Sequence, residues 1–366
     1  MIHVYNSFVH PAAFDYVREV LSSTLLSEGR LVEQFEQRLS ADLGLQHPVA
    51  LNSGTSALHL ALVLAGIKAG DEVILPAQTF VASGLVIVQE RAVPVFADIH
   101  YATGNLNPLD IEHRITPRTK AIMAVHWGGM PCDMDEIHAV ARRHGLVVIE
   151  DAAHALGATY HGRSVGALSA FTCFSFQAIK HVTTGDGGAL CLLDPELETA
   201  ARSRRWFGID RKRSPMTELG ERAYDIQEPG FKYHLNDYAA ALGLANLQGF
   251  PARLARRRAL AKRYQQALAQ VSGLQLFAAP SDRESAWWVF GCHVERRSDF
   301  IRALNSRGVM ASVIHQGIDH NHVFGGKHMD LIQQRRFDET QIHIPLHDGL
   351  RDEDVAHVVA AIQKGW

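Results

Sequence analysis

Helix-like and strand-like hydrophobic patterns alternate along the chain from about residue 30. An amphipathic stretch at residues 32–43 and an apolar stretch at 58–65 predict helices, and residues 72–76 predict a short strand after a Gly-Asp turn. Further β-rich runs of strand length lie at residues 93–96, 121–125, 146–149 and 171–176. This alternation predicts a mainly parallel sheet with helices on both faces, which binds ligands at the carboxyl ends of its strands.

The pattern changes after about residue 240. Residues 253–270 predict one long helix with a basic face, and a break near Pro280 and Ser281 separates it from a mixed α/β tail that ends at Trp366. A chain of 366 residues is long enough for one large domain and a smaller one. We therefore predict a large cofactor-binding domain over residues 1–245 and a small C-terminal domain over residues 246–366.

Charge and cysteine usage narrow the function classes. The net charge of -3 provides no basic field that would attract nucleic acid or an anionic membrane, so small molecules and copies of the chain are the expected partners. The four cysteines form no C-x-x-C pair, which argues against a disulfide framework and a thiolate metal site. Neither a leader-like N-terminus nor an apolar run long enough to cross a bilayer is visible, and we expect a cytoplasmic enzyme.

Three segments at predicted strand ends carry chemically useful side chains. In the first, Asn52-Ser53-Gly54-Thr55-Ser56-Ala57-Leu58, a glycine-containing turn with hydroxyl residues opens a helix. Free backbone N–H groups and the positive end of the helix dipole would seat a phosphate there, with the Thr55 and Ser56 hydroxyls as further donors. Simple N-capping explains the same residues.

The second segment, Ile149-Glu150-Asp151-Ala152-Ala153-His154, places two carboxylates directly after a buried strand. A carboxylate that faces a heterocyclic cation would keep a pyridine nitrogen protonated and make the ring an electron sink. A metal ligand or a helix N-cap are the alternative interpretations of this segment.

The third segment runs from Phe174 to Gly188 and sets Lys180 between a strand and a glycine-rich turn. A partly buried lysine at a strand edge can have a lowered pKa and form a Schiff base with an aldehyde. A solvated surface lysine is the alternative, although apolar residues on one side and tight-turn glycines on the other argue against it.

Together these segments are specific. The order and spacing of S-G-T-S-A-L, G-D-E-V-I-L-P-A-Q-T-F-V-A, E-D-A-A-H-A-L-G and F-S-F-Q-A-I-K-H-V-T-T-G-D-G-G closely resemble the DegT/StrS family of nucleotide-sugar aminotransferases, which are fold-type I pyridoxal-phosphate enzymes. The resemblance covers nearly the whole chain. It implies a large domain whose mainly parallel seven-stranded sheet lies between helices, and a smaller α/β C-terminal domain.

The resemblance also assigns roles to individual residues. Lys180 would bind the cofactor covalently, and Asp151 would pair with the pyridine nitrogen. The phosphate would be held by Gly54, Thr55 and Ser175, the ring face would stack on Phe80, and His154 would lie near the phenolic oxygen. Asn236 matches an asparagine that reaches the phosphate from the neighbouring subunit, which implies a homodimer with shared active sites.

The implied reaction is an amino transfer in deoxyamino-sugar biosynthesis, for either a surface polysaccharide or a secondary metabolite. The resemblance implies pyridoxal 5'-phosphate as the cofactor, with pyridoxamine 5'-phosphate as the intermediate form. The amino group of L-glutamate would be moved to a nucleotide-linked keto sugar. By resemblance this sugar is a 4-keto-6-deoxyhexose. A 3-keto sugar is one alternative. Another is a sugar dehydratase that uses the same cofactor, but such relatives have histidine in place of the lysine. A cofactor-binding regulator and a metal-dependent enzyme are alternatives from other classes.

Weaker signals have two interpretations each. Among the histidines of residues 315–322, the resemblance favours His315 and His320 as substrate contacts. A polar surface loop explains the same residues. The spacing of these histidines fits no zinc pattern, so no metal is predicted. The basic run at residues 202–213 would suit a substrate diphosphate or a solvated helix end. Trp287 and Trp288 could stack on a nucleotide base, but adjacent aromatic residues in a β-rich run more often pack in a core or interface.

Overall fold

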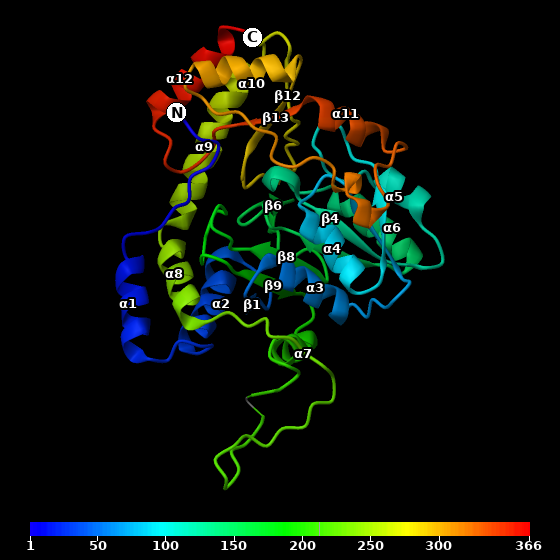
Figure 1. Ribbon diagram of the computed structural model, residues 1–366, viewed down its shortest axis with the longest axis vertical. Helices are drawn as coiled ribbons and strands as arrows, with labels where there is room; N and C mark the ends of the chain where they lie inside the picture. Colours follow the sequence, from blue (N-terminus) through cyan, green and yellow to red (C-terminus); the bar gives the residue numbers. More distant parts are fainter. Residues whose placement is uncertain (212) are drawn as a thin grey trace.

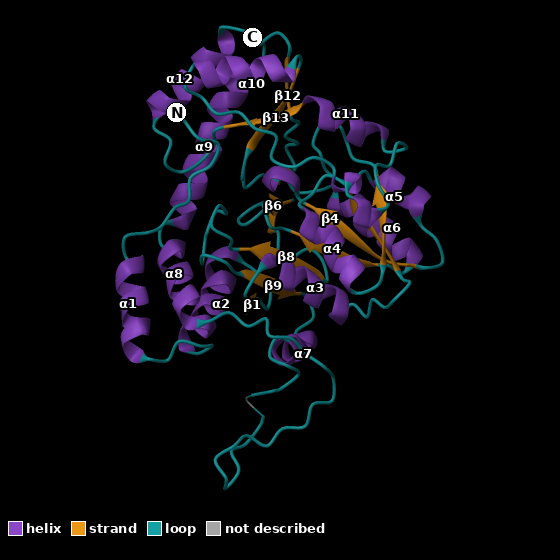
Figure 2. Cartoon of the chain, in the orientation of Figure 1, coloured by secondary structure: helices purple, strands orange, loops and turns teal. Residues whose placement is uncertain are grey.

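The computed structural model describes residues 1–211 and 213–366. It is built around one large sheet with helices packed on it (Figures 1 and 2), and this sheet has seven strands. The strand order is β1 (Val49–Leu51), β9 (Gly188–Leu192), β8 (Phe171–Ser175), β5 (Val147–Asp151), β4 (Thr119–Val125), β2 (Glu72–Pro76) and β3 (Val93–Ala97). The pairs from β8 to β3 are parallel, and β9 is antiparallel to both of its neighbours. The predicted mainly parallel sheet is confirmed.

Each face of the sheet has its own apolar core, because successive strand residues point to opposite faces. Ile74 packs into one core, and its neighbours Val73 and Leu75 pack into the other. The first core contains residues of α1 (Ala13–Ser23), α2 (Arg30–Leu43), α5 (Pro108–Arg114), α6 (Met134–His144) and α8 (Asp237–Leu247). The second contains residues of α3 (Gly54–Leu64), α4 (Val81–Gln89) and α7 (Glu196–Arg204).

The C-terminal part of the chain has a third core. It surrounds an antiparallel sheet of β10 (Leu274–Leu276), β12 (Phe290–Val294) and β13 (Gln341–Ile344), with helices α9 (Phe250–Leu268), α10 (Arg297–Ser306) and α12 (Asp352–Gln363). The N-terminal Ile2 packs against this core and bridges to Val309. The segment that precedes α11 (Ile332–Thr340) packs against the large sheet, because its residues Ile318 and Phe324 belong to the second core. The division at residue 245 stays a prediction.

Two element boundaries matter for the site. Helix α3 begins at Gly54, earlier than the predicted residue 58, because the Ser53 side chain caps it by accepting the Ser56 N–H at 3.0 Å. Strand β5 extends beyond the predicted residue 149 and ends at Asp151. Both differences bring polar groups to the same edge of the sheet.

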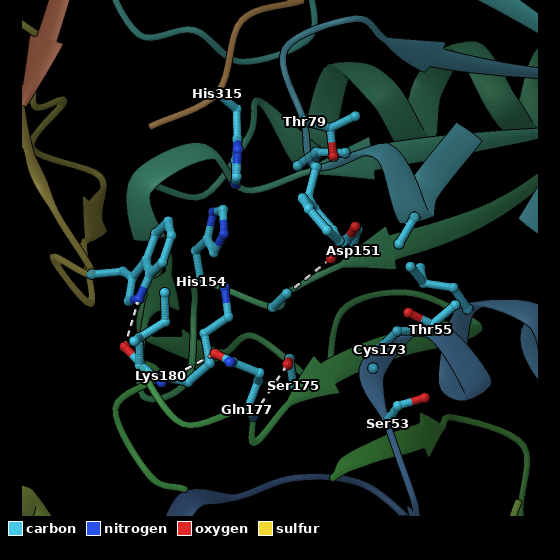
Figure 3. Close-up of a pocket in the computed structure, with 18 of the residues that line it drawn as sticks. Ser53, Thr55, Thr79, Asp151, His154, Cys173, Ser175, Gln177, Lys180 and His315 are labelled. Atoms are coloured by element: carbon cyan, nitrogen blue, oxygen red, sulfur yellow. Dashed lines mark hydrogen bonds between the residues drawn. The ribbon is translucent and has the colours of Figure 1, made fainter. Parts of the chain in front are cut away.

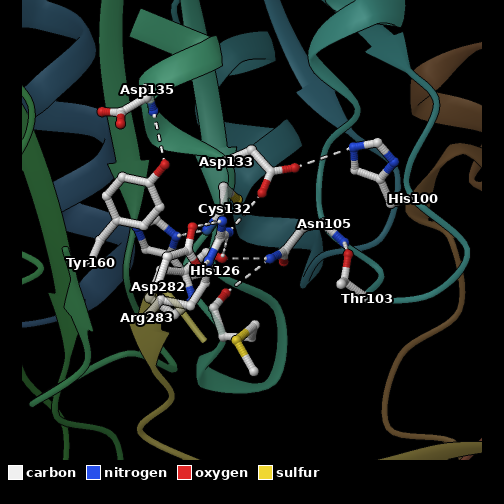
Figure 4. A network of polar contacts seen from close by, with 12 residues as sticks. His100, Thr103, Asn105, His126, Cys132, Asp133, Asp135, Tyr160, Asp282 and Arg283 are labelled. Atoms are coloured by element: carbon white, nitrogen blue, oxygen red, sulfur yellow. Dashed lines mark hydrogen bonds and ion pairs between the residues drawn. The ribbon is translucent and has the colours of Figure 1, made fainter. Parts of the chain in front are cut away.

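A polar network joins the C-terminal segment to the large sheet near this edge (Figure 4). Strand β11 (Arg283–Glu284) pairs with β6 (Thr159–Tyr160), which pairs with β7 (Arg163–Ser164). The Arg283 guanidinium lies 2.7 Å from an Asp133 oxygen, and His100 Nε2 lies 3.3 Å from the other. Hydrogen bonds from His100 and Arg283 lower the pKa of Asp133. This network fixes how the C-terminal segment sits on the sheet.

Two further observations concern the described residues as a whole. All four cysteines are buried and free. Across residues 1–211 and 213–366, no helix combines the length and the apolar character that a membrane crossing requires. The cytoplasmic location stays a prediction.

Candidate active site

The three segments singled out in the sequence meet around one cavity of about 340 Å³ (Figure 3). It lies where β1, β5 and β8 end, since these strands run in the same direction. Its walls include eight of the ten predicted site residues: Gly54, Thr55, Phe80, Asp151, His154, Ser175, Lys180 and His315. Residues separated by more than 200 positions in the chain therefore share one site.

One end of the cavity is the N-terminus of α3. The Gly54 and Thr55 N–H groups lie in the first turn, where a helix offers no internal acceptor. A Cβ atom on Gly54 would lie 2.9 Å from Ser175 Cβ, and one on Gly188 would lie 2.4 Å from the Ser53 carbonyl oxygen. Only glycine permits this close approach, which keeps the backbone donors exposed to an anion.

The structure separates the two adjacent carboxylates, which the sequence left equivalent. Glu150 points to the opposite face of β5, where it is fully buried and lies 2.7 Å from His126 Nε2. Asp151 faces the cavity, and its two oxygens accept the Ala153 N–H at 3.1 Å and the Ser83 hydroxyl at 2.7 Å. Asp151 is thus the carboxylate available to a ligand.

Lys180 lies in the turn that follows β8, and its N–H donates to the Gln177 carbonyl at 2.9 Å. Its Nζ atom lies 3.8 Å from the centre of the Trp288 ring. Burial lowers the pKa of Lys180 to about 7, against the opposing attraction of the Asp151 charge. A large fraction of this amine is therefore neutral, and nucleophilic, near neutral pH.

Aromatic rings and imidazoles form the wall opposite the helix. His154 stacks on Trp288 with ring centres 3.7 Å apart, and Phe80 lies 5.2 Å from His315. Burial, assisted by the Lys180 charge, lowers the pKa of His154 well below its usual value and that of His315 to about 4. Both imidazoles are neutral near pH 7, so each can donate and accept a hydrogen bond.

Two predicted site residues lie away from the cavity. Asn236 caps α8, where its side chain accepts the Ala239 N–H at 2.9 Å. His320 is exposed, and its Nδ1 atom lies 2.5 Å from the Gly317 carbonyl oxygen. The single chain does not bring either side chain to the other site residues.

Two arginines of the basic run at residues 202–213 are paired within the fold, whereas Lys212 of that run lies outside the described residues. Arg202 and Arg205 lie 2.7 and 2.6 Å from the buried Glu36 carboxylate, so their charges are used within the fold. A substrate diphosphate and a solvated helix end are both wrong for these two residues. In the part of the chain that the structure describes, no three His, Cys, Asp or Glu side chains are grouped to hold a metal ion.

Sequence reasoning missed several residues of the cavity wall, of which Trp288 and Tyr5 are the aromatic ones. Trp288 was assigned to packing, and it is indeed only 2% exposed, but it also forms part of the cavity wall. Tyr5 reaches the cavity from the N-terminus. The adjacent tryptophans gave a signal that could have been followed for Trp288, whereas Tyr5 had none, because neither hydrophobic periodicity nor a motif marks it.

The residues present fit a pyridoxal phosphate group. An anion seat with backbone and hydroxyl donors, a carboxylate held by two hydrogen bonds, and a partly neutral amine surround the same cavity. These match the phosphate, the pyridine nitrogen and the aldehyde of the cofactor respectively.

Comparison with known proteins decides the family. The sequence model of the DegT/DnrJ/EryC1/StrS aminotransferase family matches residues 9–363. The chain belongs to this family. The family and its solved members are pyridoxal-phosphate-dependent sugar aminotransferases, so the chain is such an enzyme.

Individual relatives match over almost their whole length. The spore coat polysaccharide biosynthesis protein SpsC of Bacillus subtilis is 38% identical over 95% of this chain and 92% of its own. GDP-perosamine synthase of Caulobacter vibrioides is 37% identical over 96% of this chain and 94% of its own. The sugar aminotransferase CalS13 of Micromonospora echinospora superposes with a TM-score of 0.95 at 34% identity, covering 100% of both chains. The fold-type I assignment is confirmed.

A solved relative also bears on the cofactor. Spr1654 of Streptococcus pneumoniae, with a TM-score of 0.92 and 29% identity, has been determined in PLP and PMP forms. The cofactor predicted from the sequence is therefore confirmed for the family, whereas the roles of the individual residues stay predictions.

The lowered pKa of Lys180 predicts how the apoenzyme takes up its cofactor. Only the neutral amine can attack the aldehyde, so the rate of covalent attachment should rise with pH around a midpoint near 7. Stopped-flow absorbance after mixing apoenzyme with pyridoxal phosphate measures this rate. Nα-acetyl-lysine is the control, and its midpoint should lie near the ordinary 10.5. A similar midpoint for the enzyme would contradict the burial argument.

Proposed function

We propose that this aminotransferase moves the amino group of L-glutamate to a nucleotide-linked 4-keto-6-deoxyhexose in deoxyamino-sugar biosynthesis. The observation that carries the proposal is the meeting of Lys180, Asp151 and the N-terminus of α3 at one cavity. Two relatives support the pathway by their names, one in spore coat polysaccharide biosynthesis and one a synthase of a GDP-linked amino sugar.

Lys180 is assigned the proton transfers. Bound pyridoxal phosphate supplies an electron sink that stabilises negative charge at the carbon bearing the amino group. The Lys180 amine lines the same cavity and is partly neutral, so it would take a proton from the carbon of the amino donor and return a proton during the transfer. The same groups act in reverse when the keto sugar accepts the amino group.

The remaining cavity residues bind and orient. Gly54, Thr55 and Ser175 are assigned to the phosphate, Phe80 to the ring face and His154 to the phenolic oxygen. His315 lies on the cavity wall, tilted against Phe80, and is assigned to the sugar. His320 is exposed and lies outside the cavity, so the substrate contact predicted for it has no support in the single chain.

The function is tested by supplying GDP-, UDP- and dTDP-linked 4-keto-6-deoxyhexoses with glutamate. We expect 2-oxoglutarate and the matching amino sugar in equal amounts, detected by mass spectrometry, with one nucleotide preferred. Release of a hydroxyl group without transfer of nitrogen would indicate the dehydratase. If amino sugar formed only from 3-keto sugars, the enzyme would be a 3-keto rather than a 4-keto sugar aminotransferase.

We further propose a homodimer in which Asn236 acts in the partner's site. Asn236 lies outside the cavity of its own chain, next to Asp237, whose carboxylate accepts the N–H groups of Gly29 and Val32 at 3.0 Å. These bonds anchor the Asn236 loop firmly to the start of α2. A rigid loop is suited to presenting a side chain to a second copy.

Mixing two inactive variants tests the shared site. Lys180→Ala and Asn236→Ala subunits should recover activity after they are unfolded and refolded together, because each hybrid dimer contains one site with both native residues. The separately refolded variants, mixed only after dimer formation, are the control. Activity that never exceeds the sum of the two controls would contradict sharing, and a monomer by light scattering would exclude it.

A further inference from the structure

The Asp151 carboxylate is held by Ser83, a residue to which sequence reasoning assigned no role. Ser83 lies in the first turns of α4, 68 positions before Asp151, and its side chain is fully buried. Its hydroxyl lies 2.7 Å from one Asp151 oxygen, while the Ala153 N–H occupies the other at 3.1 Å. Hydrogen bonds to a charged acceptor are about twice as strong as neutral ones.

The direction of the Ser83 proton follows from its neighbours. The hydroxyl also lies 3.3 Å from the Phe80 carbonyl oxygen and 2.7 Å from the Thr79 hydroxyl. Because it has one proton, it donates to the nearer and charged acceptor, Asp151. Thr79 must then donate to Ser83. The result is a buried chain of hydrogen bonds from Thr79 through Ser83 to Asp151, in which both hydroxyl protons point toward the carboxylate.

Burial increases the cost of losing any donor in this chain of hydrogen bonds. Thr79 and Ser83 are at most 1% exposed and Asp151 is 6% exposed, so water does not replace a lost donor easily. Donors on both oxygens also fix the rotation of the carboxylate. The carboxylate itself lines the cavity, where a ligand cation would sit.

We propose that Ser83 is a positioning residue that aims the Asp151 carboxylate at the cofactor's pyridine nitrogen and stabilises its charge there. The proposal rests on the role assigned to Asp151 under the proposed function. Segment 79–83 would then serve the cofactor twice, because Phe80 is assigned to the ring face and Ser83 supports the group assigned to the ring nitrogen.

The test compares two ligands on the same variants. Pyridoxal phosphate has the ring nitrogen, whereas 1-deazapyridoxal phosphate has a CH group there and cannot pair with Asp151. In Ser83→Ala apoenzyme, the dissociation constant of pyridoxal phosphate should rise about 5-fold, as expected for one lost hydrogen bond, while that of the analogue stays unchanged. Absorbance titration measures both, and thermal unfolding of each apoenzyme checks the fold.

Asp151→Asn and two Thr79 variants complete the design. If Asp151→Asn weakens pyridoxal phosphate but not the analogue, and Ser83→Ala weakens both ligands equally or neither, the Ser83 proposal is overturned while the Asp151 role stands. If Asp151→Asn does not discriminate between the ligands, the Asp151 role fails and the Ser83 proposal fails with it. Should Ser83→Ala not fold, Thr79→Val takes its place, with Thr79→Ser, which retains the hydroxyl, as its matched control.

Discussion

Replacing Lys180 with alanine is expected to slow amino transfer by about 10⁴-fold, the upper range for loss of a positioned acid–base group. The amine lies on the cavity wall with Asp151 and the α3 N-terminus, and no second lysine lines that cavity among the described residues. The variant should still bind pyridoxal phosphate through the phosphate seat, but without the absorbance band of a lysine-linked cofactor. Single-turnover absorbance with glutamate measures the loss.

Two controls separate chemistry from folding. Lys180→Arg retains a positive charge beside Trp288 but cannot act as a nucleophile near neutral pH, so it should be as slow as the alanine variant. Added methylamine should partly restore proton transfer in Lys180→Ala, because a small neutral amine can occupy the vacated space. Near-native rates in either variant without added amine would refute the role of Lys180.

Replacing Asp151 with asparagine is expected to slow the half-reaction with glutamate by about 10²- to 10³-fold, the usual effect of removing one electrostatic stabiliser. The amide retains the size of the carboxylate but cannot stabilise a protonated ring nitrogen, so the developing negative charge loses its sink. The dissociation constant of pyridoxal phosphate should rise less, by about 10-fold, because the phosphate seat is intact.

The ratio between these two effects is the diagnostic result. Rapid mixing with glutamate gives the rate of the half-reaction, and equilibrium titration of the apoenzyme gives the affinity. Glu150→Gln is a matched control, because Glu150 lies on the opposite face of β5 beside His126 and should affect stability more than the rate. Asp151→Asn with a near-native half-reaction would show that the ring nitrogen is not held by this residue.

Three chemical features of the cavity could be predicted from local sequence. The capping serine and the close glycine at the start of α3, the carboxylates after β5 and the lysine after β8 are short-range signals. Parallel strands bring their carboxyl ends to one edge of a sheet, so the sequence also predicts that these three segments meet. The family resemblance added the role of each residue.

Residues brought in by long-range contacts could not be predicted in the same way. Trp288 belongs to the C-terminal segment and donates its indole N–H to the Ile179 carbonyl, 109 positions away. Whether an aromatic residue lies in a core or on a cavity wall depends on what packs opposite it, and local composition does not contain that information. The arginines at 202 and 205 were misread for the same reason, since their partner Glu36 lies on a distant helix.

The sequence by itself determined helices α2, α3 and α9, the parallel strands of the large sheet and the identities of the lysine, carboxylate and helix N-terminus, because these follow from periodicity, capping and adjacency within a few residues. Only the tertiary structure decided which of Glu150 and Asp151 faces the cavity, that Ser83 supports Asp151, and that Trp288 lies against Lys180. Each of these depends on which strand face meets which helix. That choice is made by the packing of two apolar cores over the whole sheet.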